Sequence, residues 1–185
     1  MNAAGKPEDA PRTLDIGICT YRRPALETLL ESVRALVPPD RIEIGVIVAD
    51  NDDRPSARAL VYKAAAEFPF PIRYVHCPAS NISLARNACL HNSAADFLAF
   101  VDDDEIVSPD WLCALLAEAD RTGVEAVLGP VRSVYPDDAG SWMRRGDFHS
   151  TLPVWVRGEI RTGYTCNVLL RIASPHLSGR RFDIA

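Results

Sequence analysis

The stretch DFLAFVDDDE at residues 96–105 is an apolar run that ends in four consecutive acidic side chains. A short apolar run of this kind is typical of a strand that is buried on both faces, as in a parallel sheet. Neighbouring carboxylates destabilise one another unless water, a cation or a basic group relieves their repulsion. Hard cations such as Mg²⁺ and Mn²⁺ prefer oxygen ligands and bridge carboxylates to phosphates. The stretch therefore predicts a strand leading into a metal and nucleotide site, with a solvated acidic loop as the alternative.

Size and charge restrict the class of protein. With 185 residues, 48% of them hydrophobic, the chain is long enough for one domain with its own core. The 25 acidic residues outnumber the 20 lysines and arginines, and the formal net charge is −5. A nucleic-acid-binding protein needs a basic face to compete for phosphates, so we expect no nucleic-acid partner.

Cysteine usage and hydropathy indicate the compartment. The five cysteines form no CxxC pair and no cluster with histidine, which suits a reducing environment. No apolar run approaches the roughly 20 residues that a membrane-spanning helix needs. We therefore expect a cytoplasmic protein. The composition is also compatible with peripheral attachment to the inner face of the cell membrane.

Strand and helix patterns alternate along most of the chain, after a tail at residues 1–12 that we expect to be disordered. The alternation predicts strands at 14–20, 42–49, 72–75, 97–101, 124–134 and 168–172, and helices at 26–36, 57–68, 84–94 and 109–122. Ser83 and Ser108 are the expected N-caps of the last two helices, and Gly123 is the expected stop of the final one. Residues 137–163 show no clear periodicity.

This order predicts an α/β fold, with a mostly parallel central sheet and helices on both faces. Ligands of such sheets bind outside the carboxyl ends of the strands. Three polar groups follow predicted strands directly, at residues 20–23, 50–53 and 102–105. Because all three should meet at one edge of the sheet, their coincidence favours a nucleotide site over a solvated acidic loop.

Four motifs carry a family resemblance. They are ICTYRRP at 18–24, VIVADN at 46–51, SLARN at 83–87 and FVDDD at 100–104. Their order and spacing resemble those of family-2 glycosyltransferases, which have a nucleotide-sugar-binding domain of the GT-A type. The DDDE run followed by SPDWL at 108–112 is similar to bacterial glucosyltransferases that build succinoglycan-type exopolysaccharides. The resemblance covers residues 13–185, with a nucleotide-sugar part at 13–134 and an incomplete acceptor part at 135–185.

The resemblance implies roles for individual residues in nucleotide binding. Thr20, Tyr21 and Arg23 would line the nucleotide pocket. Asp50 would accept the imide hydrogen of uracil, which implies a uridine nucleotide. Arg86 would face the diphosphate, with Asn87 near it, because a guanidinium offers several fixed donors to phosphate oxygens.

The acidic run matches the Asp-x-Asp pair of the family. Asp104 is the first candidate for a ligand of Mg²⁺ or Mn²⁺. Asp102 would lie near the ribose or bind the metal as well, and Asp103 would contribute to nucleotide binding. The cation would neutralise the charge that develops on the departing nucleoside diphosphate.

The activity implied is inverting transfer of a sugar from a nucleoside diphosphate sugar, with a uridine donor expected, to a polysaccharide or lipid-linked glycan. Such enzymes need a general base, which the family places in a Glu-Asp pair after a Gly-Gly turn. This sequence stops at Ala185, near where that segment is expected, so we name no catalytic base. The alternative is a non-catalytic nucleotide-sugar-binding module, or an inactive fragment that lacks the base.

Aromatic and basic side chains leave further alternatives open. Trp111 is expected in the core, on the helix after the acidic run. Trp142 and Trp155 lie in the region without periodicity, where they could anchor the core or stack against a sugar ring. Arg144 and Arg145 could contact an anionic lipid-linked acceptor or remain solvated.

Overall fold

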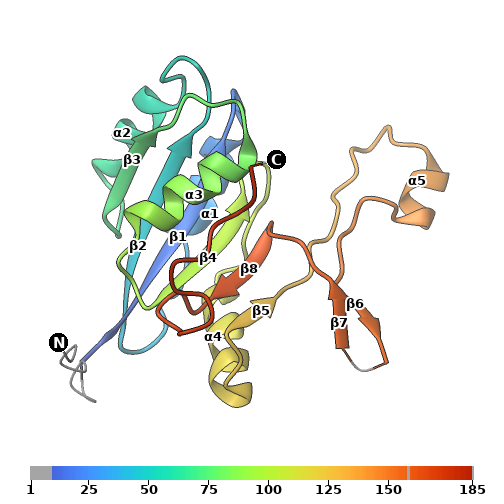
Figure 1. Cartoon of the computed structure of the whole chain (residues 1–185). Helices are drawn as coiled ribbons and strands as arrows, with labels where there is room; N and C mark the ends of the chain where they lie inside the picture. Colours follow the sequence, from blue (N-terminus) through green and yellow to red (C-terminus); the bar gives the residue numbers. More distant parts are fainter. Residues whose placement is uncertain (1–9, 158, 185) are drawn as a thin grey trace.

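A computed structural model describes residues 10–157 and 159–184 and contains a six-stranded central sheet (Figure 1). Its strands are β1 (Arg12–Thr20), β2 (Ile42–Asp50), β3 (Ile72–His76), β4 (Phe97–Asp102), β5 (Ala126–Leu128) and β8 (Asn167–Leu170). They lie in the order β3-β2-β1-β4-β8-β5. The first four in this order run parallel, and β8 is antiparallel to β4 and to β5. The predicted mostly parallel sheet is confirmed.

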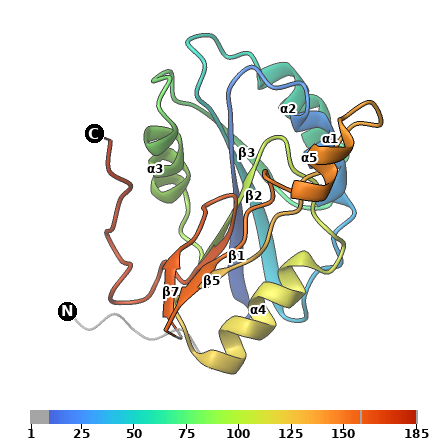
Figure 2. The ribbon, with the colours of Figure 1, turned by 90° about the vertical axis from the view of Figure 1, so that its right-hand side faces the viewer.

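Helices cover both faces of this sheet. They are α1 (Leu26–Arg34), α2 (Arg58–Ala65), α3 (Ile82–Asn92) and α4 (Trp111–Thr122). In Figure 2 the sheet is seen between α3 on one side and α1, α2 and α4 on the other. Each of β1, β2 and β3 is followed by a helix that returns the chain to the start of the next parallel strand. This is the arrangement that the alternation of apolar patterns predicts.

Side chains of each strand alternate between the two faces. In β1, Ile16 and Ile18 belong to the large core under α1, α2 and α4, which also contains Trp111. Cys19 belongs to the smaller core under α3, together with Cys89. The prediction that Trp111 is a core residue is confirmed, since it is 7% exposed.

Gly17 allows α3 to lie close to the sheet. A Cβ atom at this position would be 2.9 Å from Cε1 of Phe100 and 3.3 Å from Cβ of Cys89. Either contact is tighter than ordinary packing allows, so a larger residue would push α3 or the Phe100 ring away. The absence of a Cβ atom at Gly17 thus allows the close spacing between β1, β4 and α3.

The predicted starts of two helices are wrong. Asn81, not Ser83, caps α3, because its Oδ1 accepts hydrogen bonds from the backbone N–H groups of Ser83 at 2.9 Å and Leu84 at 3.2 Å. For α4, Ser108 opens a preceding turn, in which its carbonyl accepts from the N–H of Trp111. The predicted stop is right, since Gly123 adopts a left-handed conformation with φ of 69°.

The start of the sheet lies earlier than predicted. Arg12, which we assigned to the N-terminal tail, is the first residue of β1 and donates its N–H to the carbonyl of Arg41. Its guanidinium donates two hydrogen bonds, of 2.6 and 3.0 Å, to Asp120 on α4. The rest of the predicted tail, apart from Ala10 and Pro11, lies outside the described residues.

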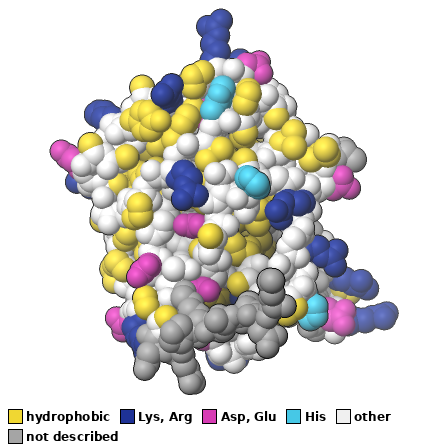
Figure 3. Space-filling view, turned by 60° about the vertical axis from the view of Figure 1, so that its left-hand side comes forward, with side chains coloured by type: hydrophobic (Ala, Val, Ile, Leu, Met, Phe, Trp, Pro, Cys, Tyr) yellow, Lys and Arg dark blue, Asp and Glu magenta, His cyan; other side chains and the backbone are white. Residues whose placement is uncertain are grey.

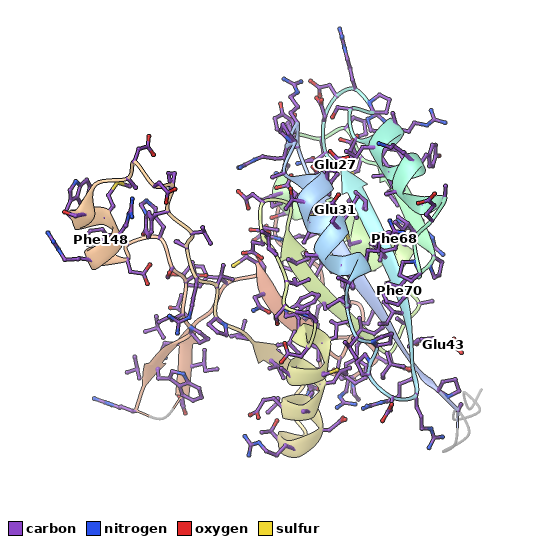
Figure 4. The ribbon with its side chains drawn as sticks, turned by 180° about the vertical axis from the view of Figure 1, so that it is seen from behind. Glu27, Glu31, Glu43, Phe68, Phe70 and Phe148 are labelled. Atoms are coloured by element: carbon purple, nitrogen blue, oxygen red, sulfur yellow. The ribbon has the colours of Figure 1, made fainter. Side chains whose placement is uncertain are left out.

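Between β5 and β8 the chain forms an arm that projects from the sheet (Figure 1). It contains α5 (Ser141–Gly146) and a hairpin of β6 (Val154–Val156) and β7 (Glu159–Thr162). The predicted strand at 124–134 is reduced to β5 and an isolated bridge between Val131 and Thr151. Trp142 and Trp155 are 63% and 64% exposed, so they do not anchor the core. Phe148 also lies on the arm, far from Phe68 and Phe70 (Figure 4).

Charged side chains are distributed over the surface. On the face shown in Figure 3, basic and acidic side chains are interspersed with apolar ones. Among residues 10–157 and 159–184, the helices are too short or too polar for any of them to cross a lipid bilayer.

Candidate functional site

The sheet topology creates a crevice at the carboxyl ends of β1 and β4. The chain continues from β1 to β2 on one side, whereas β4 lies on the other side of β1, so the strand order reverses at this point. A cavity of about 250 Å³ opens there. Apart from Asp50 and Asn87, all the predicted site residues line it, namely Thr20, Tyr21, Arg23, Arg86, Asp102, Asp103 and Asp104. All four motifs therefore reach the cavity. The motifs at 18–24, 83–87 and 100–104 do so through predicted site residues, and the motif at 46–51 does so through Asn51.

Asp103 joins the ends of β1 and β4. Its Oδ2 accepts from Thr20 Oγ1 at 2.7 Å and from the N–H of Tyr21 at 3.4 Å. The side chain is buried, and this burial raises the pKa of Asp103, while the hydrogen bond from Thr20 opposes the shift. Asp103 thus orients the loop that carries Tyr21 into the cavity.

Arg86 faces Asp102 across the cavity. Its Nη2 lies 3.6 Å from Asp102 Oδ1. Burial raises the pKa of Asp102, and the positive charge of Arg86 acts in the opposite direction. Asn87 does not face the cavity in the same way, because its side-chain amide bonds the backbone N–H and carbonyl of Phe182. Arg86 is therefore the residue of this motif that presents donors to the cavity, and Asn87 holds the C-terminal segment.

Asp104 is paired with Arg23. The guanidinium Nη1 donates to Asp104 Oδ2 at 2.8 Å, and both side chains are about half exposed. Asp102 and Asp104 line the same cavity and present carboxylate oxygens, which suit Mg²⁺ or Mn²⁺. The chemistry of these two carboxylates therefore fits a hard divalent cation, and in this structure Arg23 supplies the positive charge beside Asp104.

A second group of polar atoms surrounds Asp102. A carboxylate oxygen of Asp102, one of Glu105 and the Sγ atom of Cys166 all lie within 4.8 Å of one another. Glu105 accepts from the N–H of Asp102, and burial, more than the nearby carboxylates, raises the pKa of Glu105 to about 7. A thiol is a soft ligand and suits Mg²⁺ and Mn²⁺ poorly. The pair of Asp102 and Asp104 remains the better oxygen site.

Asp50 lies outside the cavity. Its side chain is fully buried and accepts hydrogen bonds from the N–H groups of Asp52 and Ala57, and from Tyr74 Oη at 2.7 Å. These donors occupy the carboxylate on the side of the sheet that α2 covers. In this structure Asp50 holds the loop between β2 and α2 through these hydrogen bonds. Its contact with uracil stays a prediction.

Replacement of Tyr74 by phenylalanine tests this role of Asp50. We expect Tyr74→Phe to lower the free energy of unfolding by about 1.5–3 kcal/mol, because a buried carboxylate loses a donor. Urea denaturation measures the change. Tyr62→Phe is the matched control, since Tyr62 is 55% exposed and should change stability by less than about 0.5 kcal/mol. Equal stability of both variants would contradict the structural role.

Asn51 is a site residue that the sequence analysis did not identify. It is 5% exposed and lines the cavity, next to the buried Asp50. Strand alternation could have found it, because Ile47 and Ala49 face α3 and residue 51 continues that series. Alternation places Asp50 in the opposite series, with Val46 and Val48.

An ion pair supports Tyr21 at the rim. Arg22 donates from Nε and Nη2 to Asp52 Oδ1 at 2.8 and 2.6 Å, and this contact lowers the pKa of Asp52 to about 2. The guanidinium also lies 4.9 Å from the centre of the Tyr21 ring. Arg22 has a φ of 55°, uncommon for a residue with a side chain. Asp52 thereby stabilises the backbone turn that presents Tyr21.

A separate groove of about 240 Å³ lies between α1 and α2. Glu27 and Glu31 of α1 line one side, and Phe68 lies at the other (Figure 4). The groove contains none of the predicted site residues, and no strand end delivers polar groups to it. The cavity at the carboxyl ends of the strands is therefore the candidate site.

Comparison with known proteins agrees with this placement. Residues 15–185 match the family model described as Glycosyl transferase family 2. The chain belongs to glycosyl transferase family 2. The resemblance drawn from the four motifs is thus confirmed at the level of the family.

A curated relative narrows the comparison. The chain is 63% identical to the succinoglycan biosynthesis protein ExoM of Rhizobium meliloti (strain 1021) over 172 residues. The matched region is 93% of this chain and 56% of ExoM. The chain thus spans little more than half the length of that relative.

Solved structures share the fold. Residues 1–349 of TarS from S. aureus match with a TM-score of 0.64 and 19% identity, over 87% of this chain and 47% of that one. The same TarS fragment in complex with UDP-GlcNAc matches with a TM-score of 0.63 and 18% identity, over 87% and 46%. The mannosyltransferase PcManGT of Pyrobaculum calidifontis, in complex with GDP-Man and Mn²⁺, matches with a TM-score of 0.52 and 21% identity. That match covers 73% of this chain and 39% of PcManGT. These similarities confirm the predicted GT-A-type fold.

Proposed function

We propose that this chain forms the donor-binding part of an inverting glycosyltransferase that uses a nucleoside diphosphate sugar, with UDP as the nucleotide. The observation that carries this proposal is the cavity in which Arg23 and Arg86 face three aspartates at the ends of β1 and β4. TarS, which has the same fold, binds UDP-GlcNAc, and the name of ExoM refers to succinoglycan biosynthesis. A growing polysaccharide or a lipid-linked glycan is accordingly the proposed acceptor.

The proposed roles follow from charge and position. Arg86 and Arg23 donate hydrogen bonds to the diphosphate, and Asp102 and Asp104 hold a divalent cation beside it. A bound Mg²⁺ or Mn²⁺ supplies Lewis-acid neutralisation of the leaving nucleoside diphosphate. Thr20 and Asp103 keep the ends of β1 and β4 in register, so that Tyr21 and the carboxylates face the same ligand.

We propose that residues 13–134 bind the donor and that residues 135–185, which include α5 and the hairpin of β6 and β7, belong to the acceptor side. Exposed aromatic rings on the arm support this division, because such rings stack well against sugars, and Trp142 and Trp155 are both largely exposed. We assign the role of general base to no residue of this chain.

Release of UDP from UDP-glucose tests whether the chain is an enzyme. We expect release above the protein-free background in the presence of Mn²⁺, and its loss in Arg86→Ala. A non-catalytic nucleotide-sugar-binding module would bind UDP-glucose without releasing UDP. A folded chain that neither binds nor hydrolyses UDP-glucose would contradict the proposed function.

A further inference from the structure

The segment after β8 returns along α3 and carries Phe182 to the helix (Figures 1 and 2). The backbone of Phe182 is held by one side chain of α3. Its N–H donates to Asn87 Oδ1 at 2.8 Å, and its carbonyl accepts from Asn87 Nδ2 at 2.9 Å. The ring packs edge to face on Phe100 of β4, with ring centres 5.7 Å apart. Both the backbone and the ring of Phe182 are therefore fixed in place.

The guanidinium of Arg86 lies over the Phe182 ring. Arg86 Cζ is 5.7 Å from the centre of that ring. Within about 6 Å, the face of an aromatic ring attracts a cation, and the attraction is stronger where water is excluded. The side chain of Arg86 is only 17% exposed, so little water competes for it. Phe182 thus restrains a cation that lines the cavity, although Phe182 itself does not line it.

A carboxylate attracts the same guanidinium from the side of the cavity. Asp102 Oδ1 lies 3.6 Å from Arg86 Nη2, which is beyond ordinary hydrogen-bond distance. If the guanidinium closed on Asp102, it would neutralise a carboxylate that we propose as a ligand of the divalent cation. The ring of Phe182 attracts Arg86 without using a hydrogen-bond donor. The N–H groups of Arg86 therefore stay available to a phosphate.

We propose that Phe182 is a positioning residue, which holds the guanidinium of Arg86 ready for the diphosphate. Restraining a long side chain before the ligand arrives lowers the entropy cost of binding. This inference rests on the proposed function and makes it more specific. Phe182 belongs to residues 135–185, the proposed acceptor side, so a residue of that part would support the donor site.

Replacement of the ring by an aliphatic side chain tests the inference. Phe182→Leu keeps an apolar side chain against Phe100 and removes the aromatic face. We expect the UDP affinity in Mn²⁺, measured by calorimetry, to fall by about three- to tenfold. Phe182→Tyr keeps the aromatic face, and its affinity should stay within about twofold of the unaltered chain. Equal affinities of Phe182→Leu and Phe182→Tyr would overturn the inference.

A double-mutant cycle separates positioning from a general effect on the fold. If Phe182 acts through Arg86, then Phe182→Leu should change the UDP affinity of the Arg86→Ala chain by less than about twofold. A merely structural role would lower the affinity equally in both backgrounds. Phe70→Leu is the matched control, because Phe70 also packs edge to face, on Phe68, and does not line the cavity. Its UDP affinity should equal that of the unaltered chain.

The outcomes distinguish the inference from the proposed function. If Phe182→Leu binds UDP as the unaltered chain does, or weakens binding equally with and without Arg86, the inference is wrong and the donor site stands. If the folded, unaltered chain binds no UDP with Mn²⁺, both are wrong. If Arg86→Ala binds too weakly for the cycle, the difference between Phe182→Leu and Phe182→Tyr decides. Thermal unfolding shows that each variant is folded, and Phe182→Met replaces Phe182→Leu if the latter does not fold.

Discussion

Asp104→Asn should weaken the Mn²⁺-dependent binding of UDP by at least about 100-fold. Loss of a residue that only orients a metal ligand costs 10–100-fold in affinity, so loss of a direct carboxylate ligand should cost no less. The effect on stability should be small, because Asp104 is 46% exposed and its ion pair with Arg23 lies at the surface. Calorimetric titration of UDP with Mn²⁺ measures the change.

Asp53→Asn is the control for this prediction. Asp53 follows β2, which lies on the other side of β1 from β4. It is exposed and does not line the cavity, so the substitution removes one negative charge without removing a ligand. We expect its UDP affinity to stay within about threefold of the unaltered chain. If both variants lose the same affinity, the effect is one of net charge and Asp104 is not a ligand.

Phe100→Ala should lower the free energy of unfolding by about 3–5 kcal/mol. Phe100 is 2% exposed in β4 and packs edge to face on Phe182, with ring centres 5.7 Å apart. Its ring also fills the space left by Gly17, so its removal leaves a cavity between β1 and α3. The substitution would therefore destabilise β4, the strand that leads to the three aspartates of the site.

Phe148→Ala is the matched control for the core substitution. Phe148 is 67% exposed on the arm, where it contacts Trp142 with ring centres 6.1 Å apart (Figure 4). Urea denaturation should give a change of less than about 1 kcal/mol for this variant. A smaller loss in Phe100→Ala than in Phe148→Ala would mean that β4 is not packed as the structure has it.

The sheet and its helices could be predicted from the sequence because their apolar patterns are strong. β4 is buried at five of its six residues, and β1 and β2 are buried over their carboxyl halves. Polar residues after such strands must reach the same edge of a parallel sheet. That rule was sufficient to bring Thr20 and Asp102 into one cavity, whereas Arg86, which lies on α3, was identified through the family resemblance.

Residues 50 and 51 show where the prediction ended. The motif identified the end of β2, and the family resemblance, with which the chemistry of uracil agrees, pointed to the acid there. Alternation sends Asp50 toward α2 and Tyr74, and it sends Asn51 toward α3 and the cavity. The side of the sheet, more than the residue type, decides which of the two lines the cavity.

The arm could not be predicted because it lacks a buried face. All the described residues of β6 and β7 are exposed, so their sequence has no reason to alternate apolar with polar side chains. Trp142 and Trp155 suggested anchors only because large aromatic residues are usually buried. Asn81 was missed as a helix cap because Ser83 has the same chemistry two residues later.

The central claim is that the three aspartates at the end of β4, with Arg23 after β1 and Arg86 on α3, bind a nucleoside diphosphate together with a divalent cation. Calorimetric titration of the chain with UDP, first in Mn²⁺ and then in excess chelator, tests it most directly. We predict saturable binding in Mn²⁺ that chelator abolishes or weakens at least tenfold. Binding that is identical in chelator, or no binding to a chain shown to be folded, would contradict the account.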